Sequence, residues 1–171
     1  MIEVRHISKS FNGVKVLHDI SATFDAGKTN LIIGQSGSGK TVLMKSIIGI
    51  HRVDEGDILY GNSNFTSMNS KEVTNLRKEI GMLFQGSALF DSMTVEENVR
   101  FPLEMFSNKP KGEWKERVDF CLNRVGLSHA AKLYPAEISG GMQKRAAIAR
   151  AIVLQPTYLF CDEPNSGLDP K

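Results

Sequence analysis

The order of apolar and polar positions predicts strands early in the chain. Up to residue 33, apolar side chains alternate with polar ones or form short runs, and Asn12-Gly13 is a strong hairpin turn signal. The apolar run at residues 31–33 predicts a strand, and residues 42–48 predict a helix that ends near Gly49. A turn is expected at residues 55–57, followed by a short strand at residues 58–60.

The pattern becomes mainly helical after Gln85. Before it, residues 71–79 predict a helix and residues 80–84 a buried strand. Thr94 and Glu97 then have capping-box spacing, and an apolar stripe between residues 114 and 125 predicts a core helix that Gly126 ends. Residues 108–112 read as a surface loop. Residues 158–161 predict a last apolar strand, in which Cys161 is expected to be buried.

Composition excludes several classes of protein. The 171 residues suffice for one domain with a core, and 21 basic against 19 acidic residues give a net charge of +2. Because the charges are nearly balanced and the basic residues are scattered along the sequence, no nucleic-acid partner is expected. The two cysteines form no C-x-x-C pair, so we expect neither a zinc site nor a disulfide framework. This cysteine usage is typical of a protein in the reducing cytosol. The first residues lack the apolar region of a signal peptide, and no run approaches the ~18 apolar residues of a membrane span. Any crossing of a membrane would need a partner.

A glycine-rich segment between the strand at 31–33 and the helix at 42–48 predicts a phosphate-binding loop. It matches G-x-x-x-x-G-K-[ST] over eight positions: Gly34, Gln35, Ser36, Gly37, Ser38, Gly39, Lys40 and Thr41. Glycines let backbone N–H groups turn toward an anion, and the following helix adds its positive end. Lys40 brings a mobile charge to the outer phosphates, and the Thr41 hydroxyl can ligate Mg²⁺. The segment predicts binding of a nucleoside triphosphate.

Two other positions suggest chemistry around a nucleotide. Asp162 and Glu163 follow four apolar residues. Acidic side chains at the end of a buried strand usually bind a cation or accept a proton. Phe11 has two interpretations. It either packs as an ordinary strand aromatic or offers its ring to an adenine.

The remaining motifs resemble those of a known family. Ser139-Gly140-Gly141 begins a helix, and residues 165–170 read Asn-Ser-Gly-Leu-Asp-Pro just after the acid pair. With the phosphate loop and Gln85 at a strand end, this order resembles the ATP-binding cassette ATPases of ABC transporters. The resemblance implies an α/β fold with a P-loop NTPase (RecA-like) core, an N-terminal antiparallel β subdomain and an inserted α-helical subdomain. It implies one domain over residues 1–171, with residues 1–85 and 156–171 as the core, residues 86–155 as the helical part and the C-terminal part missing.

The resemblance also implies a role for each matching position. Glu163 would be the catalytic base, assisted by Gln85 and Lys40, and Mg²⁺ would be held by Thr41, Gln85 and Asp162. The implied ATP-binding positions are Phe11, Val16, the loop from Gly34 to Thr41, Val42, Ser139, Gly140, Gly141 and Asp169. In the family, the Ser139 segment faces ATP held by a second ATPase subunit. In the family, a transmembrane permease docks near residues 85–99, and this docking places the ATPase subunits at the cytoplasmic face of the inner membrane.

Two positions depart from the family pattern. Met142 stands where the signature usually has Gln, with Gln143 one place later. The switch histidine is missing, because His6, His18, His51 and His129 all precede residues 165–170. We therefore expect a fragment that hydrolyses ATP poorly by itself.

The transported substrate and the wider role stay open at this stage. Residues 86–99 most resemble the ATPases of Mla-type phospholipid transport, and polar amino-acid importers share parts of the segment. Leu89 and Phe90 within it are either permease contacts or buried core. The alternatives to a transport ATPase are a nucleotide-gated clamp of the DNA-repair or ribosome-associated kind and a cassette that binds ATP without turnover.

Overall fold

The computed structural model describes residues 1–108 and 110–163 of the chain, which forms two compact units, Met1–Asn75 and Leu76–Lys171. The division falls within helix α2 (Ser70–Lys78), close to the helix predicted for residues 71–79. The combination of an antiparallel β unit with helices and parallel strands confirms the expected α/β class. The finer grouping of residues 1–85 with 156–171 stays a prediction.

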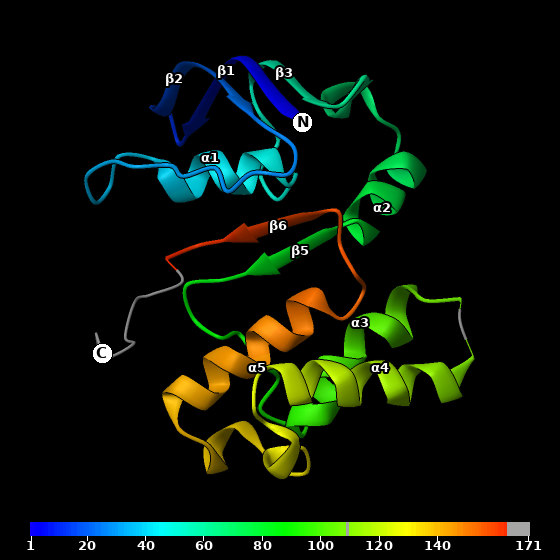
Figure 1. The fold of residues 1–171 in the computed structure, drawn as a ribbon. Helices are drawn as coiled ribbons and strands as arrows, with labels where there is room; N and C mark the ends of the chain where they lie inside the picture. The colour runs from blue at the N-terminus through cyan, green and yellow to red at the C-terminus, as the bar shows by residue number, and fades with distance from the viewer. Residues whose placement is uncertain (109, 164–171) are drawn as a thin grey trace. The chain divides into compact units, whose positions relative to one another are not determined.

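An antiparallel sheet forms the first unit (Figure 1). Its strand order is β2-β1-β3-β4, with β1 (Ile2–Phe11), β2 (Val14–Phe24), β3 (Glu55–Tyr60) and β4 (Ser63–Asn64). The predicted turn joins β1 to β2, where Asn12 and Gly13 take φ values of 51° and 80°. Helix α1 (Lys40–Ile47) ends before Gly49, whose φ of 76° is the left-handed end expected there, and the short η1 (Phe65–Ser67) follows β4. The buried apolar side chains of this unit are Ile2, Val4, Ile7, Leu17, Leu43, Met44, Ile47, Ile48, Ile58 and Tyr60.

Two predictions in this unit were wrong. Residues 31–33 form no strand, and Leu31 and Ile33 are 78% and 84% exposed. A strand needs a neighbour that accepts its hydrogen bonds, and no strand of the described residues pairs with this run. The turn expected at residues 55–57 is instead the start of β3. Gly56 lies so close to β1 that a Cβ there would sit 2.4 Å from the carbonyl oxygens of Arg5 and His6.

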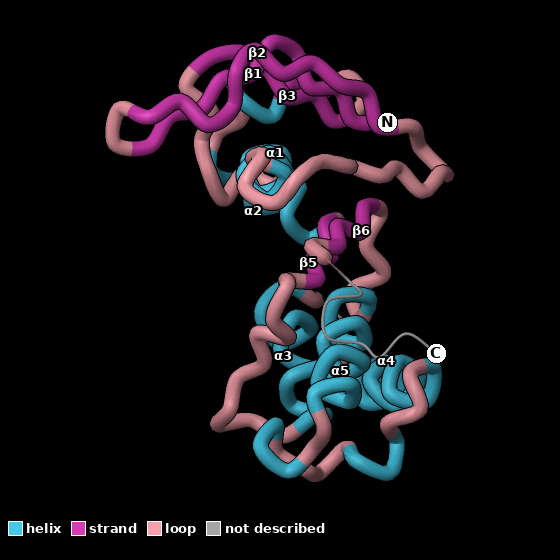
Figure 2. The backbone as a smooth tube through the Cα atoms, turned by 90° about the vertical axis from the view of Figure 1, so that its left-hand side faces the viewer, coloured by secondary structure: helices cyan, strands magenta, loops and turns pink. Residues whose placement is uncertain are grey.

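The described residues of the second unit consist mainly of three helices and two parallel strands. Strand β5 (Ile80–Leu83) pairs with β6 (Tyr158–Cys161), although the two strands lie at opposite ends of this unit's sequence (Figure 1). Helices α3 (Val95–Phe106), α4 (Lys111–Arg124) and α5 (Gly140–Ile152) gather around one core in Figure 2, with the short η2 (Ser128–Ala130) and η3 (Pro135–Glu137) between α4 and α5. The buried side chains are Val95, Val99, Leu103, Val118, Cys121, Leu122, Leu127, Ala130, Ile138, Ala146, Ala149 and Val153.

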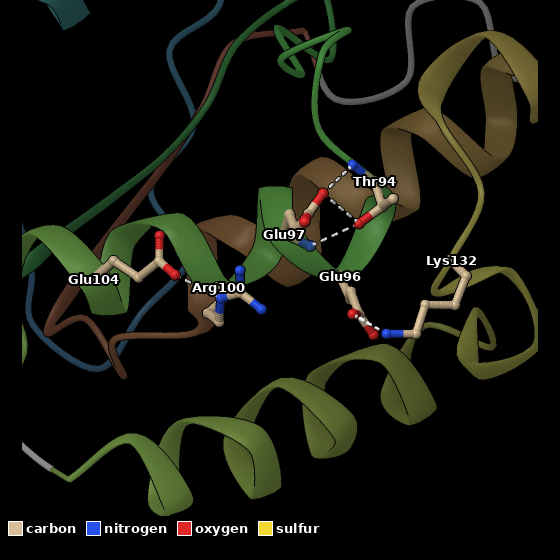
Figure 3. Close-up of polar contacts among 6 residues, drawn as sticks. All are labelled: Thr94, Glu96, Glu97, Arg100, Glu104 and Lys132. Carbon is tan, nitrogen blue, oxygen red and sulfur yellow. Dashed lines mark hydrogen bonds and ion pairs between the residues drawn. The ribbon is translucent and has the colours of Figure 1, made fainter.

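The start of α3 confirms the predicted capping box (Figure 3). The Thr94 hydroxyl accepts from the Glu97 amide at 3.4 Å, and the Glu97 carboxylate accepts from the Thr94 amide and hydroxyl, each at 2.8 Å. These bonds from Thr94 hold the pKa of Glu97 below its usual value. The neighbouring ion pairs of Glu96 with Lys132 and of Arg100 with Glu104 lie on the surface, where such pairs contribute little to stability.

The predicted burial of Cys161 was wrong. Cys161 is exposed, and so is Leu159 at 51%. Helix α5 packs over β5, where a Cβ on Gly81 would sit 2.4 Å from the Ala151 carbonyl oxygen. Strand β6 therefore forms the less covered side of the two-stranded sheet, which the apolar sequence alone does not reveal. Within the described residues, no helix combines the length and apolar character that crossing a bilayer requires.

Candidate functional site

The phosphate loop precedes α1 as predicted, and its backbone explains its glycines. Gly37 and Gly39 have φ values of 77° and 92°, in the left-handed region that side-chain-bearing residues avoid. A Cβ on Gly39 would also lie 3.3 Å from the Val16 carbonyl oxygen, so Val16 packs directly beside the loop. A side chain at position 39 would therefore be crowded at its Cβ as well as strain the backbone.

Lys40 closes this loop in the structure. Its Nζ donates to the carbonyl oxygens of Gly34 and Gln35, each at 2.8 Å, and the Ser38 amide donates to the Gln35 carbonyl at 3.2 Å. Residues 34–38 are exposed, so a ligand can reach the loop. The first turn of α1, which contains Thr41 and Val42, carries no acidic side chain that would oppose an anion at this positive helix end. These features fit the phosphates of a nucleotide.

Phe11 lies at the end of β1 with 37% of its surface exposed. Its ring meets the His51 ring edge-on at 5.1 Å between centroids, and Lys9 Nζ lies 5.4 Å from the Phe11 ring centroid. Burial, with the charges of Lys45 and Lys9, lowers the pKa of His51, which favours a neutral imidazole beside the ring. Exposure keeps the Phe11 ring available to a base, and stacking on adenine stays a prediction.

In the second unit, the parallel pairing brings Gln85 and the acid pair together. Leu83 pairs with Cys161, and the Asp162 amide donates to the Leu83 carbonyl oxygen at 2.9 Å. Just beyond these strand ends, Gln85 Nε2 donates to Glu163 Oε2 at 2.8 Å. Asp162 is buried, whereas Glu163 is exposed and has a φ of 46°. The unit thus presents one buried and one exposed carboxylate, the latter held by an amide.

The Ser139 segment begins α5 in the way the sequence predicts. The Ser139 hydroxyl accepts from the Met142 amide at 3.3 Å, which caps the helix, and no acid lies in its first turn. A Cβ added to Gly140 or to Gly141 would meet no atom of the described residues within 4 Å. The packing of this part of the chain therefore does not require glycine at either position.

The structure explains the departure at Met142. Its side chain packs against the helical core, so it replaces a polar residue with an apolar contact. Gln143 makes the polar contacts at this helix start. Its Nε2 donates to the Pro135 carbonyl oxygen at 2.8 Å, and its Oε1 accepts from the Ser87 hydroxyl at 3.3 Å. Asp169 and residues 165–170 as a whole lie outside the described residues.

Sequence reasoning missed two polar side chains that shape the segment after Gln85, the buried Asn98 and the half-buried Arg150. Asn98 is fully buried and donates to the carbonyl oxygens of Phe90, Met93 and Thr94, while its own oxygen accepts from the Phe90 amide at 2.7 Å. Arg150 donates to the carbonyl oxygens of Ser87 and Ala88, and burial lowers its pKa. A polar residue inside an otherwise apolar helical face was the available signal for both.

Comparison with other proteins agrees with this arrangement. The chain is 43% identical over 169 residues to the "probable ribonucleotide transport ATP-binding protein mkl" of Mycobacterium leprae, covering 99% of this chain and 49% of that protein. It is 41% identical over 171 residues to the "methionine import ATP-binding protein MetN" of Clostridium tetani, covering 100% of this chain and 54% of that protein. The chain thus spans about half the length of these relatives.

Solved structures from ABC transporters have the same fold as this chain. A dimeric ATP-binding cassette, MJ0796, bound to ADP and Pi, superposes with a TM-score of 0.90 at 29% identity, over 99% of this chain and 76% of that one. The protein cbiO1 from Clostridium perfringens, part of the ABC transporter complex cbiONQ, superposes with a TM-score of 0.86 at 32% identity, over 99% of this chain and 67% of that one. The family model described as "ABC transporter" matches residues 17–166. On the strength of this match and of the motifs that the fold presents, the chain belongs to the ABC transporter family of ATP-binding cassettes.

Proposed function

We propose that the protein binds ATP with Mg²⁺ and hydrolyses it to drive transport across a membrane. The observation that carries the proposal is the hydrogen bond from Gln85 to Glu163 at the ends of β5 and β6, beside the buried Asp162. Hydrolysis of a phosphoanhydride needs an oriented water and neutralised charge more than it needs covalent chemistry. A carboxylate held in place by an amide suits the first task.

We assign the roles as follows. Glu163 accepts the proton of the attacking water, and Gln85 fixes the orientation of the Glu163 carboxylate. Lys40 leaves the Gly34 and Gln35 carbonyl oxygens to neutralise charge on the outer phosphates. The loop from Gly34 to Thr41, with Val42, holds the phosphates, and Phe11 and Val16 contact the base and sugar. Asp169 is assigned to the nucleotide by resemblance alone.

The donor atoms fit magnesium. Mg²⁺ in nucleotide sites is held by one or two carboxylates or hydroxyls together with phosphate oxygens, not by a cage of protein ligands. By resemblance to the family, Thr41, Gln85 and Asp162 are the proposed ligands. When bound, Mg²⁺ supplies positive charge to the phosphates.

A direct measurement tests this function. Calorimetry on the intact protein should show ATP binding with Mg²⁺ present and much weaker binding in EDTA. A phosphate-release assay under the same conditions should show turnover. Binding without turnover would favour the regulatory cassette that binds ATP only, and the absence of both would overturn the proposal.

We further propose that a second copy of the ATPase subunit completes each site. The open space around Gly140 and Gly141 supports this, because glycine allows another molecule's phosphates to approach the backbone at the start of α5. Ser139 adds a hydroxyl at the same helix end. The related cassette MJ0796 is described as dimeric, which is in keeping with the idea. The homodimer should form in ATP-containing buffer and be detected by light scattering.

The proposed docking site for a transmembrane permease is an apolar hollow beside the segment after Gln85. It has a volume of about 350 Å³, and its apolar lining includes Met82, Phe84, Phe90, Phe101, Pro102 and Phe106. Phe90 is 43% exposed and contacts the Phe101 ring at 4.9 Å between centroids, while Leu89 packs against the helical core. We therefore choose Phe90, and not Leu89, as the permease contact. This contact would hold the ATPase at the cytoplasmic face of the membrane.

Phe90→Asp should weaken association with the permease by about 10- to 100-fold, because burying an aromatic side chain contributes roughly 1.5–3 kcal/mol. The measurement is co-purification of the intact protein with its membrane partner in detergent. Phe120→Asp is the matched control, since Phe120 is 53% exposed on α4 and does not line the hollow. Equal retention of the partner by both variants would rule out this docking site.

For the substrate class we propose phospholipid, on the similarity of residues 86–99 to the Mla-type ATPases. The names of the relatives point to other solutes, a ribonucleotide for one and methionine for the other. Stimulation of ATP hydrolysis in the reconstituted transporter by phospholipid, and not by methionine or ribonucleotide, would support the lipid. The reverse pattern would make a small-solute importer the better assignment.

A further inference from the structure

The guanidinium of Arg150 ties the signature helix to the segment that carries Gln85. From the last turn of α5, its Nη1 donates to the Ala88 carbonyl oxygen at 2.7 Å and its Nη2 to the Ser87 carbonyl oxygen at 2.9 Å. Both acceptors are backbone atoms, so the bonds fix the path of the chain irrespective of side chains there. Ala88 takes a left-handed φ of 49°, a conformation that costs an alanine energy and persists only where contacts hold it.

A second bond holds the same segment to the same helix. The Ser87 hydroxyl donates to Gln143 Oε1 at 3.3 Å, and Gln143 lies about two helical turns before Arg150, on the same side of α5. Gln143 is itself fixed by its bond to the Pro135 carbonyl oxygen. Segment 87–88 is therefore attached to α5 at two separate points, which prevents it from sliding or pivoting along the helix.

The other end of this segment reaches the proposed catalytic base. Gln85, two residues before Ser87, donates to Glu163. Helix α5, which carries the attachment points, begins at the Ser139 cap. A continuous set of contacts thus runs from the start of α5 through Arg150 and Gln143 to Gln85 and Glu163, all within the second unit.

We propose that Arg150 is a positioning residue that makes α5 and the Gln85 segment move as one body, so that the placement of α5 determines whether Gln85 holds Glu163. The inference rests on the proposed ATPase function. A chain of contacts does not by itself show that Arg150 and Gln85 are energetically coupled. A double-mutant cycle measures that coupling directly.

The first test is a cycle of Arg150→Gln and Gln85→Ala in the intact protein. With Gln85 present, Arg150→Gln should lower kcat by about tenfold and leave KM for ATP nearly unchanged, an interaction within the range measured for contacting residues. With Gln85→Ala, the same substitution should change kcat by less than about twofold, because the group through which Arg150 acts is gone. Arg150→Lys, which can reach one carbonyl oxygen but lacks the fork to hold two, should restore part of kcat.

Arg117 provides a matched control. Its guanidinium also donates to two backbone carbonyl oxygens of the α5 end, Val153 at 2.9 Å and Ile152 at 2.7 Å, but not to the Gln85 segment. Arg117→Gln should lower stability in urea unfolding as Arg150→Gln does. Any effect of Arg117→Gln on kcat should be the same with and without Gln85. If Arg150→Gln does not fold, Arg150→Lys takes its place in the cycle.

Hydrogen exchange tests the attachment without relying on activity. The peptide spanning residues 84–90 should exchange faster in Arg150→Gln and at the wild-type rate in Arg117→Gln. Unchanged exchange in both variants, or additive effects of Arg150→Gln and Gln85→Ala on kcat, would overturn the inference. A wild-type protein that releases no phosphate would instead refute the proposed function, and the exchange result would then decide the role of Arg150 by itself.

Discussion

Glu163→Gln should slow phosphate release by about 10²–10⁴-fold, the usual contribution of a general base, and leave ATP binding almost intact. The substitution keeps the size of the side chain and an oxygen that can accept from Gln85 Nε2, so the contact at 2.8 Å survives while the proton acceptor is lost. Phosphate release at saturating Mg·ATP, together with calorimetry of binding, measures the two effects separately.

Glu116→Gln is the control for that substitution. Glu116 is exposed on α4, and no role is assigned to it, so its amide variant should hydrolyse ATP at the wild-type rate. Turnover of Glu163→Gln at the wild-type rate would show that another group takes the proton. Loss of binding along with turnover would show that Glu163 acts mainly on the fold of the site.

Lys40→Ala should weaken ATP binding by about 10- to 100-fold, because a hydrogen bond to a charged group contributes roughly 1.5–3 kcal/mol. In the structure the Lys40 ammonium spans two carbonyl oxygens of its own loop, and ATP phosphates offer it stronger, charged acceptors. The measurement is the Kd for Mg·ATP by calorimetry on the intact protein.

Lys28→Ala supplies a comparison with the same loss of charge. Lys28 pairs with Asp25 at 2.8 Å on the exposed surface, so its removal should leave the Kd unchanged. A normal Kd for Lys40→Ala would contradict the assignment of the loop. Thermal unfolding of both variants without nucleotide measures any loss of stability that follows from removing the Lys40 hydrogen bonds to Gly34 and Gln35. This separates an effect on stability from an effect on ATP binding.

Local signals explain the elements that were predicted correctly. The Asn12-Gly13 turn, the capping box of Thr94 and Glu97, and the Ser139 cap each depend on residues within four positions of one another. Their hydrogen bonds and φ angles therefore depend on the local sequence and not on distant contacts. The backbone of residues 34–40 is local in the same way, because its left-handed glycines and the start of α1 follow one another in the sequence.

Long-range contacts account for the predictions that were wrong. Whether residues 31–33 form a strand depends on a neighbouring strand, and Gly56 belongs to β3 because β1 approaches it closely. Cys161 is exposed since α5 covers β5, which lies beside it. No periodicity within these segments carries information about such neighbours.

Spacing along the chain is enough to identify the residues that can do chemistry here: a glycine loop with Lys40, a strand-end acid pair, and a serine at a helix start. How some of these residues meet depends on the folded chain. Parallel pairing of β5 with β6 puts Gln85 against Glu163 across 78 positions of sequence, and packing of α5 lets Arg150 hold Ser87 and Ala88. The two partners of each such hydrogen bond are brought together by the packing of the helices between them, so local sequence order does not identify them.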